Sequence, residues 1–314
     1  MNNSFLDFEK PIAEIRDKIQ ALEGVVEENP ELLSQIQKLV DEEKKITQSI
    51  YSKLSSWQIV QVARHPKRPH TADYISRIFN DFDELHGDRM FGDDSSLIGG
   101  LAYLEDKPVV VIGHEKGRDT EEKVKRNFGM PQPEGYRKAK RLMKLAEQFS
   151  IPLITFIDTS GAYPGMEGEE RGQSEAIASN LALMSELRTP IIVVVTGEGG
   201  SGGALALGIG DHVSMLQYST YAVASPEACS SIVWRSSDFA SEAADAMKVN
   251  ANELLKINVI DEVINEPLGG AHRDYDLSAN NIKKSLLTNL GRLNNLDLDS
   301  LLENRYKKLV SIGQ

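Results

Sequence analysis

Short, almost wholly apolar runs alternate with helical patterns over most of the chain. The runs Pro108–Ile112, Ile151–Ile157 and Pro190–Thr196 are rich in valine and isoleucine. A strand without a polar face is usually buried on both sides, as in a parallel sheet. Helical patterns over Glu134–Phe149 and Glu169–Leu187 lie between these runs. The alternation predicts a layered α/β architecture with right-handed crossovers.

Weaker patterns continue toward the C-terminus. Shorter strands are expected near Val213–Leu216, Tyr221–Ala224 and Val259–Ile264, and the last segment, Ala279–Ile312, predicts two helices with leucine-rich faces. No internal repeat and no low-complexity segment interrupts this order, so the pattern predicts a single α/β unit.

The N-terminal region has a different pattern. Apolar residues recur at steps of three, four or seven over Glu31–Trp57, which predicts an amphipathic helix. A second helix, about Glu9–Glu23, is expected to pack antiparallel to it, as a hairpin lying on its own domain or as part of a coiled coil. Prolines follow and end the helical pattern. We therefore divide the chain into an N-terminal helical hairpin, residues 1–62, and an α/β domain with C-terminal helices, residues 63–314.

Charge and composition narrow the class of protein. The 314 residues include 35 basic and 47 acidic ones, so the net charge of −12 disfavours nucleic acid or an anionic membrane as a partner. No apolar stretch approaches the roughly 18 residues of a membrane span, and the N-terminus does not resemble a signal peptide. The single cysteine, Cys229, excludes an internal disulfide and a zinc site built from several thiolates. No histidine pair has the i, i+4 spacing of a helical metal site. We expect a cytoplasmic protein without a metal.

A glycine-rich segment follows the third apolar run. Five of the seven residues from Gly197 to Gly203 are glycine, and a helix rich in alanine and leucine is expected directly afterwards. Glycine lets the backbone approach a ligand closely. The first N–H groups of a helix lack carbonyl partners and carry the positive end of its dipole. The segment therefore predicts a cradle for negative charge.

Several chemistries fit this segment. Three of its glycines satisfy the dinucleotide pattern G-x-G-x-x-G, but no acidic residue lies about 20 positions later. The pattern G-x-S-x-G makes Ser201 a candidate nucleophile, with His212 or His272 and Asp211 or Asp261 as nominal partners. An oxyanion hole of main-chain amides needs no nucleophile. The glycines also fit a purely structural role, in which they allow the helix to pack tightly on the sheet.

A second glycine loop, Asp158–Gly165, lies at the end of the preceding strand, about 40 residues earlier in the sequence. Together the two loops resemble the alpha-subunit family of the carboxyltransferase of bacterial acetyl-CoA carboxylase. The resemblance runs nearly from end to end. Further matching stretches are Phe5–Glu9, Ala63–Pro66, Gly113–His114, Asn127–Pro131 and Leu268–Arg273.

The resemblance implies a crotonase-like fold, a spiral of β-β-α units. It implies transfer of a carboxyl group from carboxybiotin, held on the biotin carboxyl carrier protein, to acetyl-CoA, which gives malonyl-CoA for fatty-acid synthesis. It also implies an α2β2 assembly in which the beta subunit carries zinc, and a separate biotin carboxylase that uses ATP. The alternatives are a crotonase-like hydratase, isomerase or thioesterase that acts on acyl-CoA alone, a serine hydrolase that uses Ser201, and a non-catalytic scaffold.

The implied chemistry assigns roles to the glycine loops. Negative charge develops on the ureido group of biotin as carbon dioxide leaves, and this group can take the methyl proton, so no side-chain base is required. The substrates are carboxybiotin and acetyl-CoA, and no cofactor is bound covalently. We expect the amides of Gly202 and Gly203 to donate to the biotin oxyanion, Gly199, Gly200 and Ser201 to shape the approach, and Gly161 and Ala162 to line the facing side.

Basic residues are concentrated between Lys116 and Lys144. This segment holds ten basic and four acidic residues, a balance of 10 − 4 = +6. It is either a solvated helix face or a positive rim that attracts carboxybiotin, CoA phosphates or an acidic partner. Few aromatic residues accompany the charges, which disfavours single-stranded nucleic acid.

Overall fold

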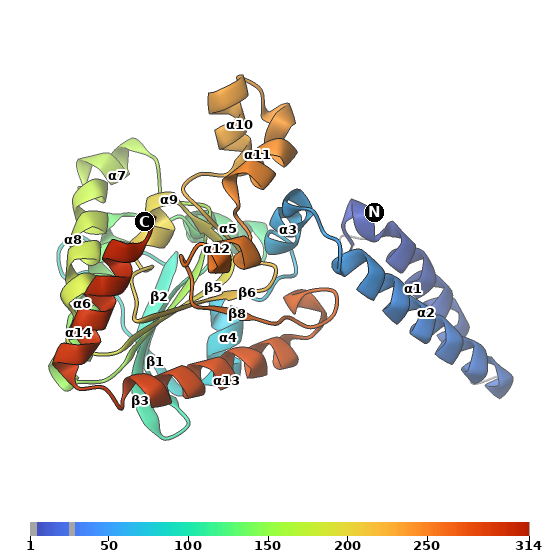
Figure 1. Cartoon of the computed structure of the whole chain (residues 1–314), viewed down its shortest axis with the longest axis horizontal. Helices are drawn as coiled ribbons and strands as arrows, with labels where there is room; N and C mark the ends of the chain where they lie inside the picture. The colour runs from blue at the N-terminus through green and yellow to red at the C-terminus, as the bar shows by residue number, and fades with distance from the viewer. Residues whose placement is uncertain (1–4, 25–28, 314) are drawn as a thin grey trace.

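The computed structural model describes residues 5–24 and 29–313 and has an eight-stranded sheet at its centre, with helices on both faces (Figure 1). The strand order is β1-β2-β3-β4-β5-β6-β8, and β7 pairs with β5 off this path. The strands are β1 (Asn80–Glu84), β2 (Leu97–Leu104), β3 (Lys107–His114), β4 (Leu153–Thr159), β5 (Ile191–Gly200), β6 (His212–Leu216), β7 (Thr220–Ala222) and β8 (Glu262–Ile264).

Helices make up most of the rest of the described chain. The α-helices are α1 (Lys10–Glu23), α2 (Leu33–Tyr51), α3 (Ser56–Ala63), α4 (Thr71–Ile78), α5 (Thr120–Lys125), α6 (Pro133–Phe149), α7 (Met166–Glu170), α8 (Gln173–Glu186), α9 (Ser201–Leu205), α10 (Pro226–Trp234), α11 (Ala240–Met247), α12 (Ala251–Lys256), α13 (Tyr275–Leu293) and α14 (Leu298–Ser311). Short 3₁₀ helices are η1 (Asp7–Glu9), η2 (Pro30–Leu32), η3 (Asn127–Gly129), η4 (Ser237–Phe239) and η5 (Ala271–Arg273). No described helix is long and apolar enough to cross a membrane.

The central strands are buried on both faces. Val110 and Ile112 of β3 belong to the core formed with α6 and α8, whereas Val109 and Val111 belong to the core formed with α4 and α13. The pairs β3–β4, β4–β5, β5–β6 and β6–β8 are all parallel. The parallel sheet predicted from the apolar runs is therefore confirmed.

The antiparallel strands β1 and β2 were not predicted. β1 has the sequence NDFDE, whose polar residues suit an exposed edge strand better than a buried one. In β2 the apolar run is interrupted by Gly99 and Gly100. A Cβ on Gly100 would lie 2.0 Å from the carbonyl oxygen of Asp83, so the glycine is required where β1 pairs closely with β2.

Two predicted helices are each divided in the structure. The helix expected over Glu31–Trp57 ends at Tyr51, because Ser55 and Gln58 form reciprocal capping bonds that begin α3. The helix expected over Glu169–Leu187 is divided into α7 and α8 at Gly172, whose φ is 83°. Both predictions of a continuous helix were wrong.

The antiparallel helices α1 and α2 project away from the sheet, and they do not lie on the domain as one of the predictions had it (Figure 1). The base of the hairpin is anchored on the domain. Tyr51 packs edge-on against Tyr218, with 5.3 Å between ring centroids, and Ile12 and Val62 join the same cluster. Residues 1–4 and 25–28 of the predicted N-terminal region lie outside the described residues.

Candidate active site

The glycine-rich segment belongs half to a strand and half to a short helix. β5 continues to Gly200, beyond the predicted strand end at Thr196, because Glu198–Gly200 pair with β7. A Cβ on Gly199 would lie 2.6 Å from the ring of Tyr221, and one on Gly200 would lie 2.1 Å from the carbonyl oxygen of Ser160. The glycines therefore allow three chain segments to lie unusually close together. The helix predicted directly after the glycines is present as α9, which begins at Ser201 and is five residues long.

The two glycine loops are in direct contact. A Cβ on Gly203 would lie 2.5 Å from the carbonyl carbon of Gly161 and 2.7 Å from the nitrogen of Ala162. The Thr159 hydroxyl donates to the Gly161 carbonyl oxygen over 2.8 Å and accepts from the Gly161 N–H over 3.1 Å. The structure thus brings together the candidate residues of the two loops, and the first loop is fixed by its own side chain.

A cavity of about 720 Å³ opens beside the second loop. Its volume lies within the range of about 300–1,000 Å³ that is typical of small-molecule sites. Its lining is mostly apolar and includes Ser201, Gly202, Leu205, Val223, Met247 and Ile312. Gly202 and the exposed Ser201 thus form part of the wall, whereas Gly203 lies buried behind it against Gly161.

A chain of ion pairs lies beneath the glycine strand. The ammonium nitrogen of Lys116 is 2.7 Å from the Asp158 carboxylate and 2.9 Å from that of Glu198. Arg64 bonds the other oxygen of Glu198 and reaches on to Glu227 in α10. The Asp158 carboxylate also accepts the main-chain N–H of Glu198 over 3.0 Å. The strand end is therefore fixed through both the main chain and the side chain of Glu198.

Lys116, Asp158 and Glu198 stay charged although Asp158 is buried and the other two are only partly exposed. Burial opposes ionisation of Lys116, but the adjacent carboxylates of Asp158 and Glu198 outweigh it and raise the pKa of Lys116. Burial likewise opposes ionisation of the two acids, yet Lys116 holds the pKa of both Asp158 and Glu198 below the usual values. Lys116, Asp158 and Glu198 are therefore all ionised across the physiological pH range.

A family model described as acetyl co-enzyme A carboxylase carboxyltransferase-like matches residues 5–313. The chain belongs to this family. The alpha subunit of acetyl-coenzyme A carboxylase carboxyl transferase from Azotobacter vinelandii is 57% identical to it over 315 residues, which cover 100% of both chains. The resemblance predicted from the two glycine loops is confirmed.

Solved structures support the same fold class. A Pseudomonas malonate decarboxylase hetero-tetramer with coenzyme A matches with a TM-score of 0.57 and 17% identity, covering 68% of this chain and 86% of that chain. Transcarboxylase 12S with methylmalonyl-coenzyme A bound matches with a TM-score of 0.55 and 20% identity, covering 67% of this chain and 41% of that one. These neighbours have the crotonase-like fold, so that prediction is confirmed.

The carboxyltransferase-like chain does not assemble a serine hydrolase around Ser201. His212 is in register with Ile192 near the start of β5, whereas Ser201 follows the end of that strand. The other nominal base, His272, is stacked against His65 with 3.8 Å between ring centroids. The nominal acid Asp211 forms an ion pair with Arg305, and Asp261 forms one with Lys308. The four nominal partners are all engaged elsewhere.

Part of the basic segment between Lys116 and Lys144 is engaged inside the molecule. Four of its cations form ion pairs with carboxylates, and two more donate to main-chain carbonyl oxygens. The ion-paired residues are Lys116, Arg118, Arg137 and Lys138, and the other two are Arg126 and Arg141. These contacts give the six residues a structural role.

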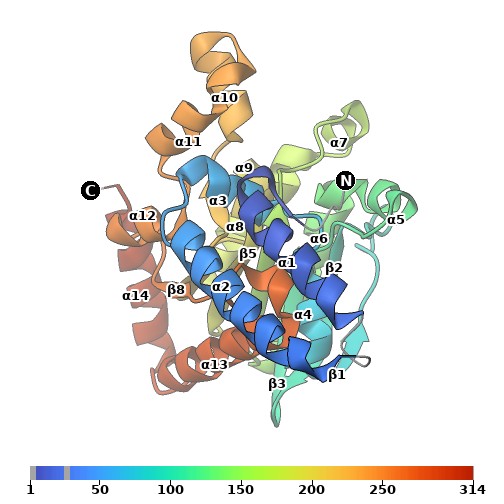
Figure 2. The same cartoon turned by 90° about the vertical axis from the view of Figure 1, so that its right-hand side faces the viewer.

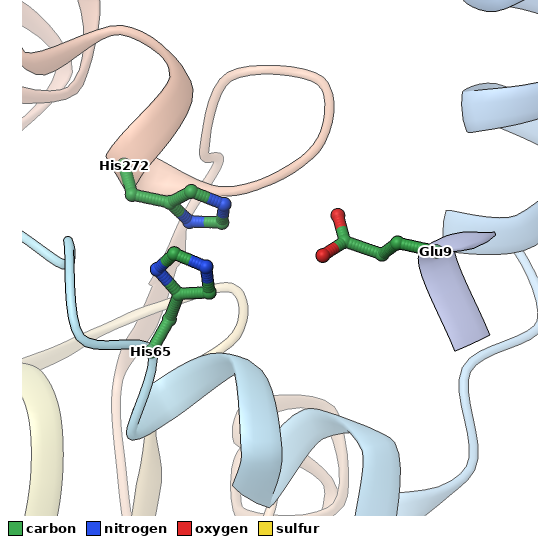
Figure 3. Close-up of side chains that lie close together, drawn as sticks. All are labelled: Glu9, His65 and His272. Carbon is green, nitrogen blue, oxygen red and sulfur yellow. The ribbon is translucent and has the colours of Figure 1, made fainter. Parts of the chain in front are cut away.

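Glu9, His65 and His272 come together from three distant parts of the chain (Figure 3). Their potential ligand atoms all lie within 4.8 Å of one another. The two imidazole rings are nearly parallel, however, with 14° between their planes, so their nitrogen lone pairs do not converge on one point. Nδ1 of His65 accepts the N–H of Lys67 over 3.1 Å, whereas a metal-bound histidine normally donates from its second nitrogen.

The Glu9 carboxylate has partners from three other residues. It accepts hydrogen bonds from the Tyr51 hydroxyl over 2.9 Å, from Arg273 over 2.8 Å and from the Leu6 N–H over 2.7 Å. Burial, helped by the positive charges nearby, lowers the pKa of His272 to about 2. This arrangement fits an anchor between the hairpin base and the α/β domain, and it does not fit a metal site. The sequence had given no reason to pair His65 with His272.

Proposed function

We propose that this chain is the alpha component of a carboxyltransferase that forms malonyl-CoA from acetyl-CoA. The observation that carries the proposal is the contact between the two glycine loops, in a chain whose full-length relatives bear that name. Carboxybiotin supplies the carboxyl group, and the methyl carbon of acetyl-CoA accepts it. The product serves fatty-acid synthesis in the cytoplasm.

The chain itself stabilises developing negative charge. The main-chain N–H groups of Gly202 and Gly203 donate to an oxyanion from the first turn of α9, where the helix leaves its N–H groups without intrahelical partners. Each donor of this kind contributes about 2.7–4 kcal/mol to lowering a reaction barrier. Gly199, Gly200 and Ser201 shape the approach, and Gly161 and Ala162 line the facing side.

The proposed complex needs other proteins. We expect an α2β2 assembly with the carboxyltransferase beta subunit, which serves the thioester and carries zinc. The biotin carboxyl carrier protein delivers carboxybiotin after a separate biotin carboxylase has formed it with ATP. The malonate decarboxylase that matches this fold is likewise a hetero-tetramer, although that likeness supports the fold alone.

Carboxyl transfer to acetyl-CoA, measured with this chain and the beta subunit separately and together, tests the proposal. We expect activity only when both subunits are present. Turnover of an acyl-CoA by this chain alone would instead support the crotonase-like hydratase or isomerase. Assembly with the beta subunit without any transfer would support a scaffold role.

A further inference from the structure

We propose that Arg64 is a positioning residue that ties the glycine strand to a projecting helical arm, so that the placement of the arm sets the geometry of the oxyanion loop. The arm comprises α10, η4 and α11, residues 226–247, and stands out from the domain in both views (Figures 1 and 2). The inference deepens the proposed function and rests on it.

Arg64 occupies the junction between the two parts. It is the C-cap of α3, and its side chain is 30% exposed. Its Nε donates to Glu198 of the glycine strand over 2.5 Å, and its two terminal nitrogens donate to both carboxylate oxygens of Glu227 over 2.5 and 3.3 Å. The planar guanidinium holds its donors in a fixed fork, so the two carboxylates are held at a set separation.

Glu198 transmits this constraint to the loop. One of its carboxylate oxygens bonds Arg64 and the other bonds Lys116, while its N–H donates to Asp158. Glu198 precedes Ser201 in the same run of backbone, and a Cβ on the neighbouring Gly197 would lie 2.2 Å from the Asp158 carboxylate. A shift of Glu198 therefore moves the strand end from which α9 begins.

The arm is attached at the same place. Glu227 lies in the first turn of α10, which Ser225 caps by accepting the Ala228 N–H over 3.1 Å. The base of the arm packs on α3 through Ala244 and Val60. A small cavity between arm and strand is lined from both sides, among others by Arg64, Glu198, Gly200 and Pro226. Displacement of α10 thus changes the surroundings of the glycine strand directly.

The far end of α10 is apolar and exposed. Ile232 is 77% exposed, Val233 60% and Trp234 43%. A partner that contacts this end would push on α10, whose first turn contains Glu227, the residue that binds Arg64. The ion pair is consequently placed to convey arm position to the loop, and it does more than hold two surfaces together.

The test is steady-state carboxyl transfer by the complex of this chain with the beta subunit. Glu227→Gln removes the negative charge in the first turn of α10 and leaves the contacts of Arg64 and Lys116 with Glu198 in place. We expect kcat to fall about tenfold and KM for acetyl-CoA to stay unchanged. A misplacement of about 1 Å in an active site can lower the rate by up to about 10²-fold, so the expected loss corresponds to a smaller shift. Arg64→Lys keeps the charge but loses the fork, and the same loss is expected. Arg77→Met, which breaks an exposed pair with Asp276, is the matched control and should match the unmodified complex.

A double-mutant comparison separates coupling from simple destabilisation. If the arm acts through Arg64, Arg64→Lys combined with Glu227→Gln lowers kcat no further than Arg64→Lys alone. Unmodified kcat in Glu227→Gln, or losses that multiply in the double variant, would overturn the inference. An unmodified complex that transfers no carboxyl group defeats the proposed function itself, whereas an active complex whose Glu227→Gln variant is equally active defeats only the role of Arg64.

Discussion

Adding one methyl group at Gly203 should disable the loop, whereas the same change at Gly202 should not. A Cβ on Gly203 would lie 2.5 Å from the carbonyl carbon of Gly161, and ordinary contacts begin at 3.4 Å. The two loops must therefore separate by 3.4 − 2.5 = 0.9 Å, against backbone that has little freedom to move. A Cβ on Gly202 would lie 3.4 Å from the flexible end of Ile177, which can adjust.

The expected magnitude follows from that displacement. A misplacement of about 1 Å in an active site costs up to about 10²-fold in rate, and loss of one oxyanion donor costs about 10²–10³-fold in kcat. We expect Gly203→Ala to lower kcat by about 10²-fold or more, because alanine keeps the N–H but the displaced backbone no longer directs it at the oxyanion. Gly202→Ala keeps its N–H and its neighbours, so its loss should be far smaller.

Carboxyl transfer to acetyl-CoA by the assembled complex measures both variants, with thermal unfolding and size-exclusion chromatography as checks on folding and assembly. KM for acetyl-CoA should stay constant in both, because in the proposed function the beta subunit serves the thioester. Equal activity of Gly203→Ala and the unmodified chain would refute the argument that contact between the loops sets the oxyanion geometry. A greater loss in Gly202→Ala than in Gly203→Ala would refute it as well.

Three further predictions concern single side chains. Ser201→Ala should retain most of the transfer activity in the same assay, and complete loss would instead favour a nucleophilic serine. Burial lowers the pKa of the fully buried His114 to about 4, so the unfolded chain binds the extra proton first as pH falls below about 6.5. His114 should therefore cost the chain on the order of 3 kcal/mol of stability between pH 6.5 and 4, and urea unfolding of His114→Leu should show a correspondingly flatter pH profile. Arg305→Met leaves Asp211 buried without its cation, and should lower the free energy of unfolding by about 3–5 kcal/mol, whereas removing both charges should cost less.

The central sheet was predictable because a strand that is buried on both faces has an almost wholly apolar sequence. Val109 to Ile112 alternate between the two cores, so each of them had to be apolar. The edge strand β1 pairs with one strand of the described sheet, β2, and has a polar sequence, and nothing in it distinguishes a strand from a loop. The end of the helix at Tyr51 depends on a local cap at Ser55, which helical periodicity does not register.

The glycine loops were predictable for a similar reason, and the charges behind them were not. A glycine at 199, 200 or 203 marks a place where no Cβ fits, and such places form a motif within one segment. Arg64, Lys116 and Glu198 are far apart in sequence, and a charged residue looks the same whether it is solvated or paired. The one available signal was Glu198 itself, an acidic side chain among glycines at the end of a buried strand.

A site made of main-chain amides depends on its surroundings more than a site made of side chains does. A side chain can reach its target by rotating, whereas the direction of a main-chain N–H group is set by the backbone conformation. The backbone at Gly200 and Gly203 touches other backbone directly, so those contacts fix its distance from the first loop. Its register with β4 and β7 sets its position along the strand, and the ion-paired Glu198 adds a further constraint from its side chain. Buried ion pairs add little net stability because desolvation offsets their attraction. Here the ion pairs fix the orientation of Glu198, because each of its carboxylate oxygens binds one cation and therefore has one preferred position.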